Sequence, residues 1–147
     1  MLKVGDAMPE TTLVGDGGPV QLRERIGKAL VVYFYPKDET YGCTKEACSF
    51  RDSYEDFVAA GADVIGVSRD DAASHKGFKE HHRLPFTLLT DPDGKVAKEW
   101  GVKGGLGLPG RVTFVFDKAG NVRHRFDSQI RFGKHVDEAL AIVKQLT

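Results

Sequence analysis

The chain has 147 residues, of which 41% are hydrophobic and 10% aromatic, a composition that gives a single domain a sizeable core. Basic and acidic residues are equal at 21 each and form no run of like charge, so binding to nucleic acid or to an anionic membrane has no electrostatic support. Two cysteines are too few for a secreted disulfide framework. We therefore expect residues 1–147 to form one cytoplasmic domain, with a mature plastid form as the alternative.

The first half of the chain predicts a strand, a helix and a second strand. A short hairpin is expected around residues 11–22 as an N-terminal extension. The run "KALVVYFYP", residues 28–36, is apolar and rich in β-branched and aromatic residues, which predicts a buried strand of a mostly parallel sheet. A helix is expected from about residue 43 to residue 60, and "ADVIGVS", residues 62–68, predicts the next strand. The expected inward face of that helix carries Phe50, Tyr54, Phe57 and Val58.

The second half continues the alternation and ends in a hairpin and a helix. The expected elements are a helix at 72–82, the strand "FTLLTD" with its turn "DPDG", a short helix at 96–100, a β-hairpin at 111–127 and a helix at 133–146. This order predicts an α/β, thioredoxin-like fold, with a central mixed β-sheet flanked by helices and an N-terminal β-hairpin extension. Trp100 is expected in the core.

The only two cysteines, Cys43 and Cys48, fall where the first long helix begins. Pro36 ends the preceding strand, and Thr40 is one of the N-cap candidates, so Cys43 is expected in the first helical turn, where free amides and the helix dipole favour a thiolate. Two helical residues at this spacing have Cα atoms roughly 8–9 Å apart, whereas a disulfide needs less than about 7 Å. The pair can bridge only if the helix unwinds, which points to transient oxidation. The alternative is that Cys43 is a small helix-start residue and Cys48 a buried hydrophobic one.

The segment "YFYPKDETYGCTKEACSFRDSY" resembles the peroxidatic segment of the peroxiredoxins, in which Pro, three residues, Thr or Ser, two residues and Cys follow in order. The continuation "CTKEAC" is similar to the bacterioferritin comigratory protein, or peroxiredoxin Q, branch. The branch usually has Pro where this chain has Tyr41. Similarity also extends through "GADVIGVSRDDAASHKGF", "LPFTLLTD", "WGV", "LPGRVTFVFDKAGNV" and "KHVDEAL", and so over nearly the whole chain.

The resemblance implies a role for each residue of the motif. Cys43 would be the peroxidatic nucleophile and Cys48 the resolving thiol. Thr40 would bind thiolate and peroxide through its hydroxyl, Pro36 would shield the pocket, and Arg111 would hold the thiolate; without the resemblance, Arg111 would be taken for a solvated residue at a strand start.

The activity implied is that of an atypical 2-Cys, thioredoxin-dependent antioxidant peroxidase. It would reduce hydrogen peroxide and alkyl hydroperoxides, form an intramolecular Cys43–Cys48 disulfide and be recycled by thioredoxin or a similar dithiol. We expect a monomer without cofactor or metal. Two other functions remain open: a thioredoxin-like disulfide carrier or thiol sensor, and a redox-inert binding module.

Three further patterns are weaker. "GLGLPG", residues 105–110, precedes a strand and therefore does not predict dinucleotide binding. "DPDG" lacks further calcium ligands and predicts a turn. The five histidines show no ligand spacing and are expected at solvated positions; His81 and His82 are adjacent and are expected to point apart, so no zinc site is predicted.

Overall fold

The computed structural model describes residues 1–104 and 110–146. The strands are β1 (Thr12–Gly15), β2 (Gly18–Gln21), β3 (Ala29–Phe34), β4 (Ala62–Ser68), β5 (Thr87–Thr90), β6 (Val112–Phe116) and β7 (Val122–Asp127). The helices are α1 (Tyr41–Ala59), α2 (Ala72–His82), α3 (Lys95–Glu99) and α4 (Phe132–Gln145), with 3-10 turns η1 (Leu22–Arg25) and η2 (Pro92–Gly94). Most of the "GLGLPG" segment lies outside the described residues.

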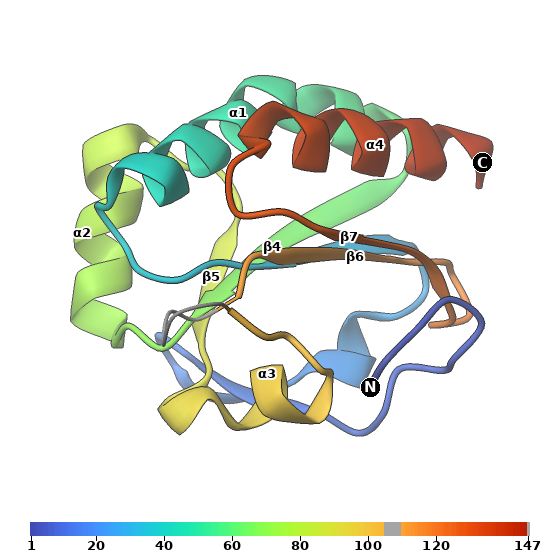
Figure 1. Ribbon diagram of the computed structural model, residues 1–147, viewed down its shortest axis with the longest axis horizontal. Helices are drawn as coiled ribbons and strands as arrows, with labels where there is room; N and C mark the ends of the chain where they lie inside the picture. The colour runs from blue at the N-terminus through green and yellow to red at the C-terminus, as the bar shows by residue number, and fades with distance from the viewer. Residues whose placement is uncertain (105–109, 147) are drawn as a thin grey trace.

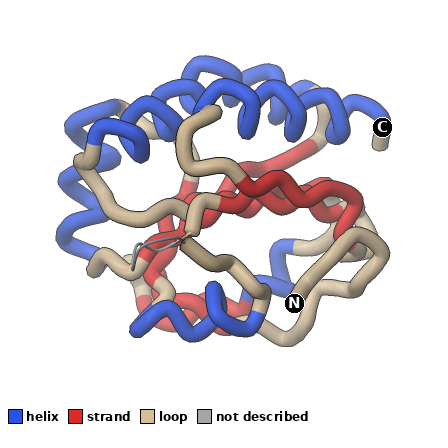
Figure 2. The backbone as a smooth tube through the Cα atoms, in the orientation of Figure 1, coloured by secondary structure: helices blue, strands red, loops and turns tan. Residues whose placement is uncertain are grey.

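The strands form one seven-stranded sheet in the order β2-β1-β5-β4-β3-β6-β7. Only the neighbours β3, β4 and β5 pair in parallel, and all other pairings are antiparallel. The thioredoxin-like mixed sheet and its N-terminal hairpin extension are confirmed. The expectation of a mostly parallel sheet is wrong, because the β1–β2 hairpin continues the sheet beyond β5 while the β6–β7 hairpin lies against β3. Figure 2 shows the strands as one layer with helices above and below it.

Strand β3 lies at the centre of the fold and is buried along its whole length. Its side chains alternate between the two faces of the sheet. Val31 and Tyr33 join the core under α1, α2 and α4, whereas Val32 and Phe34 join the core on the α3 side. In Figure 1, α1 and α4 lie side by side over one face of the sheet and α3 lies under the other. Trp100 belongs to the second core, as expected for a core residue.

Helix α1 begins at Tyr41, two residues before the expected start, with Thr40 in the N-cap position. Cys43 is therefore the third residue of the helix, inside its first turn as predicted. Phe50 and Phe57 are buried, but Val58 is largely exposed, so the inward face of α1 is narrower than the sequence spacing suggests.

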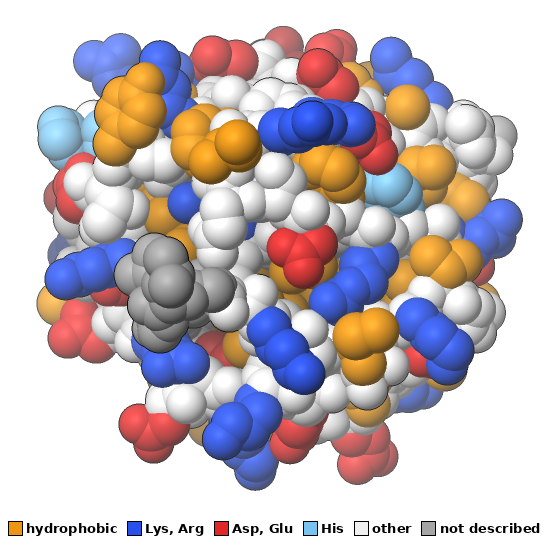
Figure 3. All heavy atoms as spheres, in the orientation of Figure 1, with side chains coloured by type: hydrophobic (Ala, Val, Ile, Leu, Met, Phe, Trp, Pro, Cys, Tyr) orange, Lys and Arg blue, Asp and Glu red, His pale blue; other side chains and the backbone are white. Residues whose placement is uncertain are grey.

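The described surface carries both signs of charge, and Figure 3 shows Lys and Arg side chains beside Asp and Glu on the visible face. Among residues 1–104 and 110–146, no helix has the length and apolar character needed to cross a bilayer.

Candidate active site around Cys43

Cys43 is completely buried, at the N-terminal end of α1 and above the centre of the sheet. Its neighbours in the core include Tyr33 and Phe50. The Thr40 side chain makes no capping hydrogen bond to the helix. The first amides of a helix have no partner within the helix, so this end of α1 presents N–H donors and the positive end of the helix dipole to an anion.

Arg111 immediately precedes β6 and directs its guanidinium at Cys43. Its Nη2 donates to the Cys43 Sγ at 3.4 Å. The residue is only 4% exposed, so the interpretation as a solvated strand-start residue is wrong. The guanidinium also lies over the ring of Phe132, 5.0 Å from its centroid. A permanent positive charge is thus held next to the sulfur in a dry environment, where it can stabilise negative charge that develops during a reaction.

Glu46 is the second partner of Arg111 and was not identified from the sequence. It is fully buried, and its Oε1 accepts a hydrogen bond of 2.9 Å from Arg111 Nη1. Burial raises the pKa of Glu46 to about 8, against the opposing charge of Arg111. The carboxyl can therefore take up a proton near neutral pH. The protonated carboxyl is uncharged, so it does not neutralise the positive charge of Arg111 beside Cys43. The spacing of Cys43 and Glu46, which puts them on one helix face, is the signal that was available.

His135 of α4 continues the buried polar group. Its Nε2 donates to the carbonyl of Ser128 at 2.7 Å, so the neutral ring accepts at Nδ1 from the Thr113 hydroxyl at 2.8 Å. Burial lowers the pKa of His135 to about 4, so the ring is uncharged at neutral pH. Glu46 Oε2 lies 3.5 Å from the same Nδ1. Arg111 therefore remains the cation beside Cys43, and the expected solvated position of His135 is wrong.

The loop between β3 and α1 is held by the buried Asp38. Its carboxylate accepts from Tyr35 at 2.6 Å, from the Ser74 hydroxyl at 2.9 Å and from His75 Nδ1 at 2.8 Å. His75 is thus another buried histidine where a solvated one was expected. These contacts fix the segment that carries Pro36, which is half-buried.

Thr40 is exposed at the end of the same loop, and its hydroxyl donates to the Lys37 carbonyl at 2.8 Å. Of the predicted site residues, Cys43 and Arg111 are in direct contact. Thr40 lies at the N-cap of α1, and its hydroxyl contacts the loop backbone and not Cys43.

Cys48 is partly buried and opens onto a surface pocket on another side of α1. Tyr41, which is 75% exposed, lines this pocket together with Glu39, His81 and His82. The two histidines do not point apart as expected: both face the Glu39 carboxylate, and their ring centroids are 4.0 Å apart.

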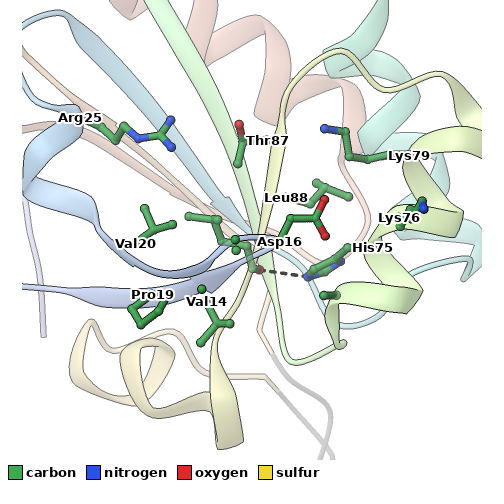
Figure 4. Close-up of a pocket in the computed structure, with 15 residues that line it drawn as sticks. Val14, Asp16, Pro19, Val20, Arg25, His75, Lys76, Lys79, Thr87 and Leu88 are labelled. Carbon is green, nitrogen blue, oxygen red and sulfur yellow. Dashed lines mark hydrogen bonds between the residues drawn. The ribbon is translucent and has the colours of Figure 1, made fainter.

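A separate pocket lies between the β1–β2 hairpin and α2 (Figure 4). Lys76 and Lys79 of α2 stand on one side of it, opposite Pro19 and Val20 of β2. None of the site residues predicted from the sequence lines this pocket, so it is distinct from the Cys43 site.

The chain is similar to known proteins in sequence and in fold. Residues 4–125 match the AhpC/TSA family. The chloroplastic peroxiredoxin Q of Oryza sativa subsp. japonica is 55% identical over 145 residues, which cover 97% of this chain and 67% of that protein. This chain thus spans about two thirds of that relative.

Solved structures show the same relationship. The crystal structure of peroxidoxin BcpB from Mycobacterium tuberculosis has a TM-score of 0.91 and 35% identity, covering 100% of this chain and 99% of that chain. A Xanthomonas campestris bacterioferritin comigratory protein, studied for its alkyl peroxide reduction activity, has a TM-score of 0.83 and 34% identity, covering 95% of this chain and 98% of that chain. This chain belongs to the AhpC/TSA family, in the peroxiredoxin Q and bacterioferritin comigratory protein branch of thiol peroxidases.

Proposed function

We propose that the chain reduces hydrogen peroxide and organic hydroperoxides at Cys43, resolves the product with Cys48 and is recycled by thioredoxin or a similar dithiol. The observation that supports this most directly is the 3.4 Å contact between Arg111 Nη2 and the buried Cys43 sulfur. The alkyl peroxide reduction attributed to the Xanthomonas campestris relative supports the substrate class. The chloroplastic name of the rice relative makes the plastid the first location to test.

The first step is a displacement on oxygen. The Cys43 thiolate attacks one peroxide oxygen, the O–O bond breaks, and the leaving oxygen takes a proton to become water or alcohol while Cys43 becomes a sulfenic acid. Arg111 stabilises the charge shared between sulfur and oxygen. For Thr40 to donate to the peroxide, its hydroxyl has to leave the Lys37 carbonyl to which it now donates, although it can accept from the peroxide as it stands. Pro36 limits access of water to the pocket.

The second step requires a change of shape. Cys43 and Cys48 both lie in the continuous helix α1, so their Cα atoms are roughly 8–9 Å apart, too far for a disulfide. The first turns of α1 therefore unwind, the Cys48 thiol attacks the sulfenic sulfur, and water leaves. A dithiol then reduces the disulfide and restores both thiols.

The test compares wild type with Cys43→Ser and Cys48→Ser, using peroxide consumption with and without thioredoxin, its reductase and NADPH. Cys43→Ser should abolish turnover. Cys48→Ser should keep the first oxidation of Cys43 nearly as fast but lose thioredoxin-dependent cycling and accumulate sulfinic acid. Ser49→Ala, one residue along the same helix, is the control and should cycle normally.

Mass spectrometry and amide exchange check the intermediate. Oxidised wild type should contain an intramolecular disulfide, and residues 40–50 should exchange faster than in the reduced protein. Turnover by Cys43→Ser within tenfold of wild type would exclude Cys43 as nucleophile. Disulfides found only between chains, or equal protection in both redox states, would exclude local resolution within α1.

A further inference from the structure

Glu39, His81 and His82 converge on the surface beside Cys48 and have no part in the peroxide chemistry. Glu39 lies in the loop before α1, and the two histidines are the last residues of α2. His81 Nδ1 lies 3.0 Å from each Glu39 carboxylate oxygen, and His82 Nε2 lies 2.8 Å from Oε1. One carboxylate oxygen and one nitrogen from each ring fit within 4.8 Å of one another.

We propose that Glu39, His81 and His82 form a binding site for a divalent transition-metal ion of the zinc class. Two imidazole nitrogens and a carboxylate are the ligand set of three-ligand zinc sites, whose fourth position is left to water or another small ligand. Imidazole ligands favour zinc, copper or nickel over magnesium and calcium, which prefer oxygen alone.

The observed spacing is close to what a metal ion needs. Zinc holds nitrogen and carboxylate oxygen at about 2.0–2.2 Å, so neighbouring ligands in a tetrahedron lie roughly 3.3–3.5 Å apart. The hydrogen bonds to Glu39 now measure 2.8–3.0 Å. The three ligand atoms would have to move apart by about half an ångström to hold a metal ion. Each histidine nitrogen that faces Glu39 would also have to lose its proton, to the other ring nitrogen or to solvent.

The backbone supports the same assignment. Glu39 has a φ of 63°, a left-handed conformation that is uncommon for a residue other than glycine. With this backbone, the carboxylate contacts both histidines at the end of α2. His82 is partly buried and packs edge-on against Phe78, at 5.2 Å between ring centroids, which limits its rotation. Two of the three ligands are therefore already oriented in the protein.

A metal in this position would restrain the helix that has to unwind. Glu39 immediately precedes the N-cap of α1, and metal–ligand bonds would tie it to α2. The restraint would slow the attack of Cys48 on the oxidised Cys43. This consequence rests on the proposed function, because that attack is one of its steps. The metal site itself does not depend on that function.

The binding test uses untagged protein in a Cys43→Ser/Cys48→Ser background, so that neither thiol can bind the metal. Calorimetric titration with Zn²⁺ should give one site per chain, and Co²⁺ should give a visible spectrum without sulfur-to-metal charge transfer. Glu39→Gln and His81→Asn/His82→Asn should each weaken binding by at least about tenfold. His124→Asn, which alters a different histidine paired with Glu138, is the matched control and should bind normally.

Either of two results would overturn the site: no stoichiometric binding of Zn²⁺ or Co²⁺, or binding that persists unchanged in the Glu39 and histidine variants. The consequence for resolution is tested separately, with both cysteines present. Zn²⁺ should slow disulfide formation in wild type but not in Glu39→Gln. If Zn²⁺ binds but disulfide formation is unaffected, the metal site stands and the restraint on α1 is wrong. Failure of the Cys43→Ser test would instead remove the peroxidase proposal and leave metal binding untouched.

Discussion

Replacing Arg111 by methionine removes the charge closest to the Cys43 sulfur while keeping a long, unbranched side chain. Arg111 Nη2 lies 3.4 Å from Sγ, and one donor aimed at the charge that develops in a transition state is worth about 3–4 kcal/mol. Each 1.36 kcal/mol corresponds to a factor of ten, so the rate of Cys43 with peroxide at pH 7 should fall roughly 100- to 1000-fold.

The substitution has a side effect that a second variant corrects. Without Arg111, the buried Glu46 carboxyl loses its charged partner, and its pKa, already raised to about 8, rises further. Arg111→Met/Glu46→Gln fixes residue 46 in an uncharged form, so a loss of rate in this variant comes from Arg111 alone. Arg125→Met is the matched control, because Arg125 also lies 5.0 Å over an aromatic ring, that of Phe114, but this ring belongs to the other core.

The assay is rapid mixing of reduced protein with peroxide, acid quenching, and mass spectrometry of alkylated Cys43. The reasoning predicts slow oxidation in both Arg111 variants and normal oxidation in Arg125→Met. A loss of less than tenfold in the Arg111→Met/Glu46→Gln variant would show that the charge of Arg111 does not control the reaction of Cys43 with peroxide.

Two further predictions concern the loop before α1. Thr40→Val should lower the rate of Cys43 oxidation by peroxide about 100-fold, because it removes a donor to the developing charge. Thr40→Ser keeps the hydroxyl and should change this rate only slightly. Equal losses of stopped-flow rate in the two variants would show that side-chain shape, and not the hydroxyl, matters. Burial alone would raise the pKa of Asp38, but hydrogen bonds from His75 and Tyr35 outweigh it and lower the pKa. The ionised Asp38 therefore stabilises the fold above its unfolded value of about 3.9, and this contribution disappears as the pH falls through the lower folded pKa. In urea unfolding, the stability difference between wild type and Asp38→Asn should narrow below about pH 4, and a constant difference down to pH 2 would contradict this.

The elements of the fold were predictable where one local pattern determined them. The apolar run in β3 and the matched spacing in β4 gave strands within a residue or two of their observed bounds, because burial on both faces leaves an unbroken hydrophobic signature. The order of the strands was less accessible. Pairing of the N-terminal hairpin with β5 depends on contacts between segments more than 70 residues apart, such as Val14 with Thr90.

The local features of the site were predictable from the sequence, but the contacts between distant segments were not. The position of Cys43 in the first turn of α1 follows from Pro36 and the helix start. In the sequence, Glu46 and His135 look like ordinary solvated helix residues, and their burial becomes evident only when the fold places Arg111 and His135 beside Glu46. The contact of Glu39 with His81, 42 residues away along the chain, is likewise evident only in the fold.

The Arg111–Glu46 pair also bears on how fast Cys48 reaches Cys43, because Glu46 lies between the two cysteines and leaves its buried position when α1 unwinds. Burial raises the pKa of Glu46 to about 8, so the ionised carboxylate is less stable in the closed helix than in the unwound one and favours opening. Glu46→Gln keeps a hydrogen-bond acceptor for Arg111 but cannot ionise, so the closed helix should be more stable and open later. We expect a first oxidation of Cys43 at least as fast as in wild type, slower disulfide formation, and more sulfinic acid at high peroxide, all measured by quenched mass spectrometry. Glu55→Gln, an exposed change on the same helix, should match wild type. A decrease in sulfinic acid in Glu46→Gln would mean that Glu46 opposes the opening of α1 instead of assisting it.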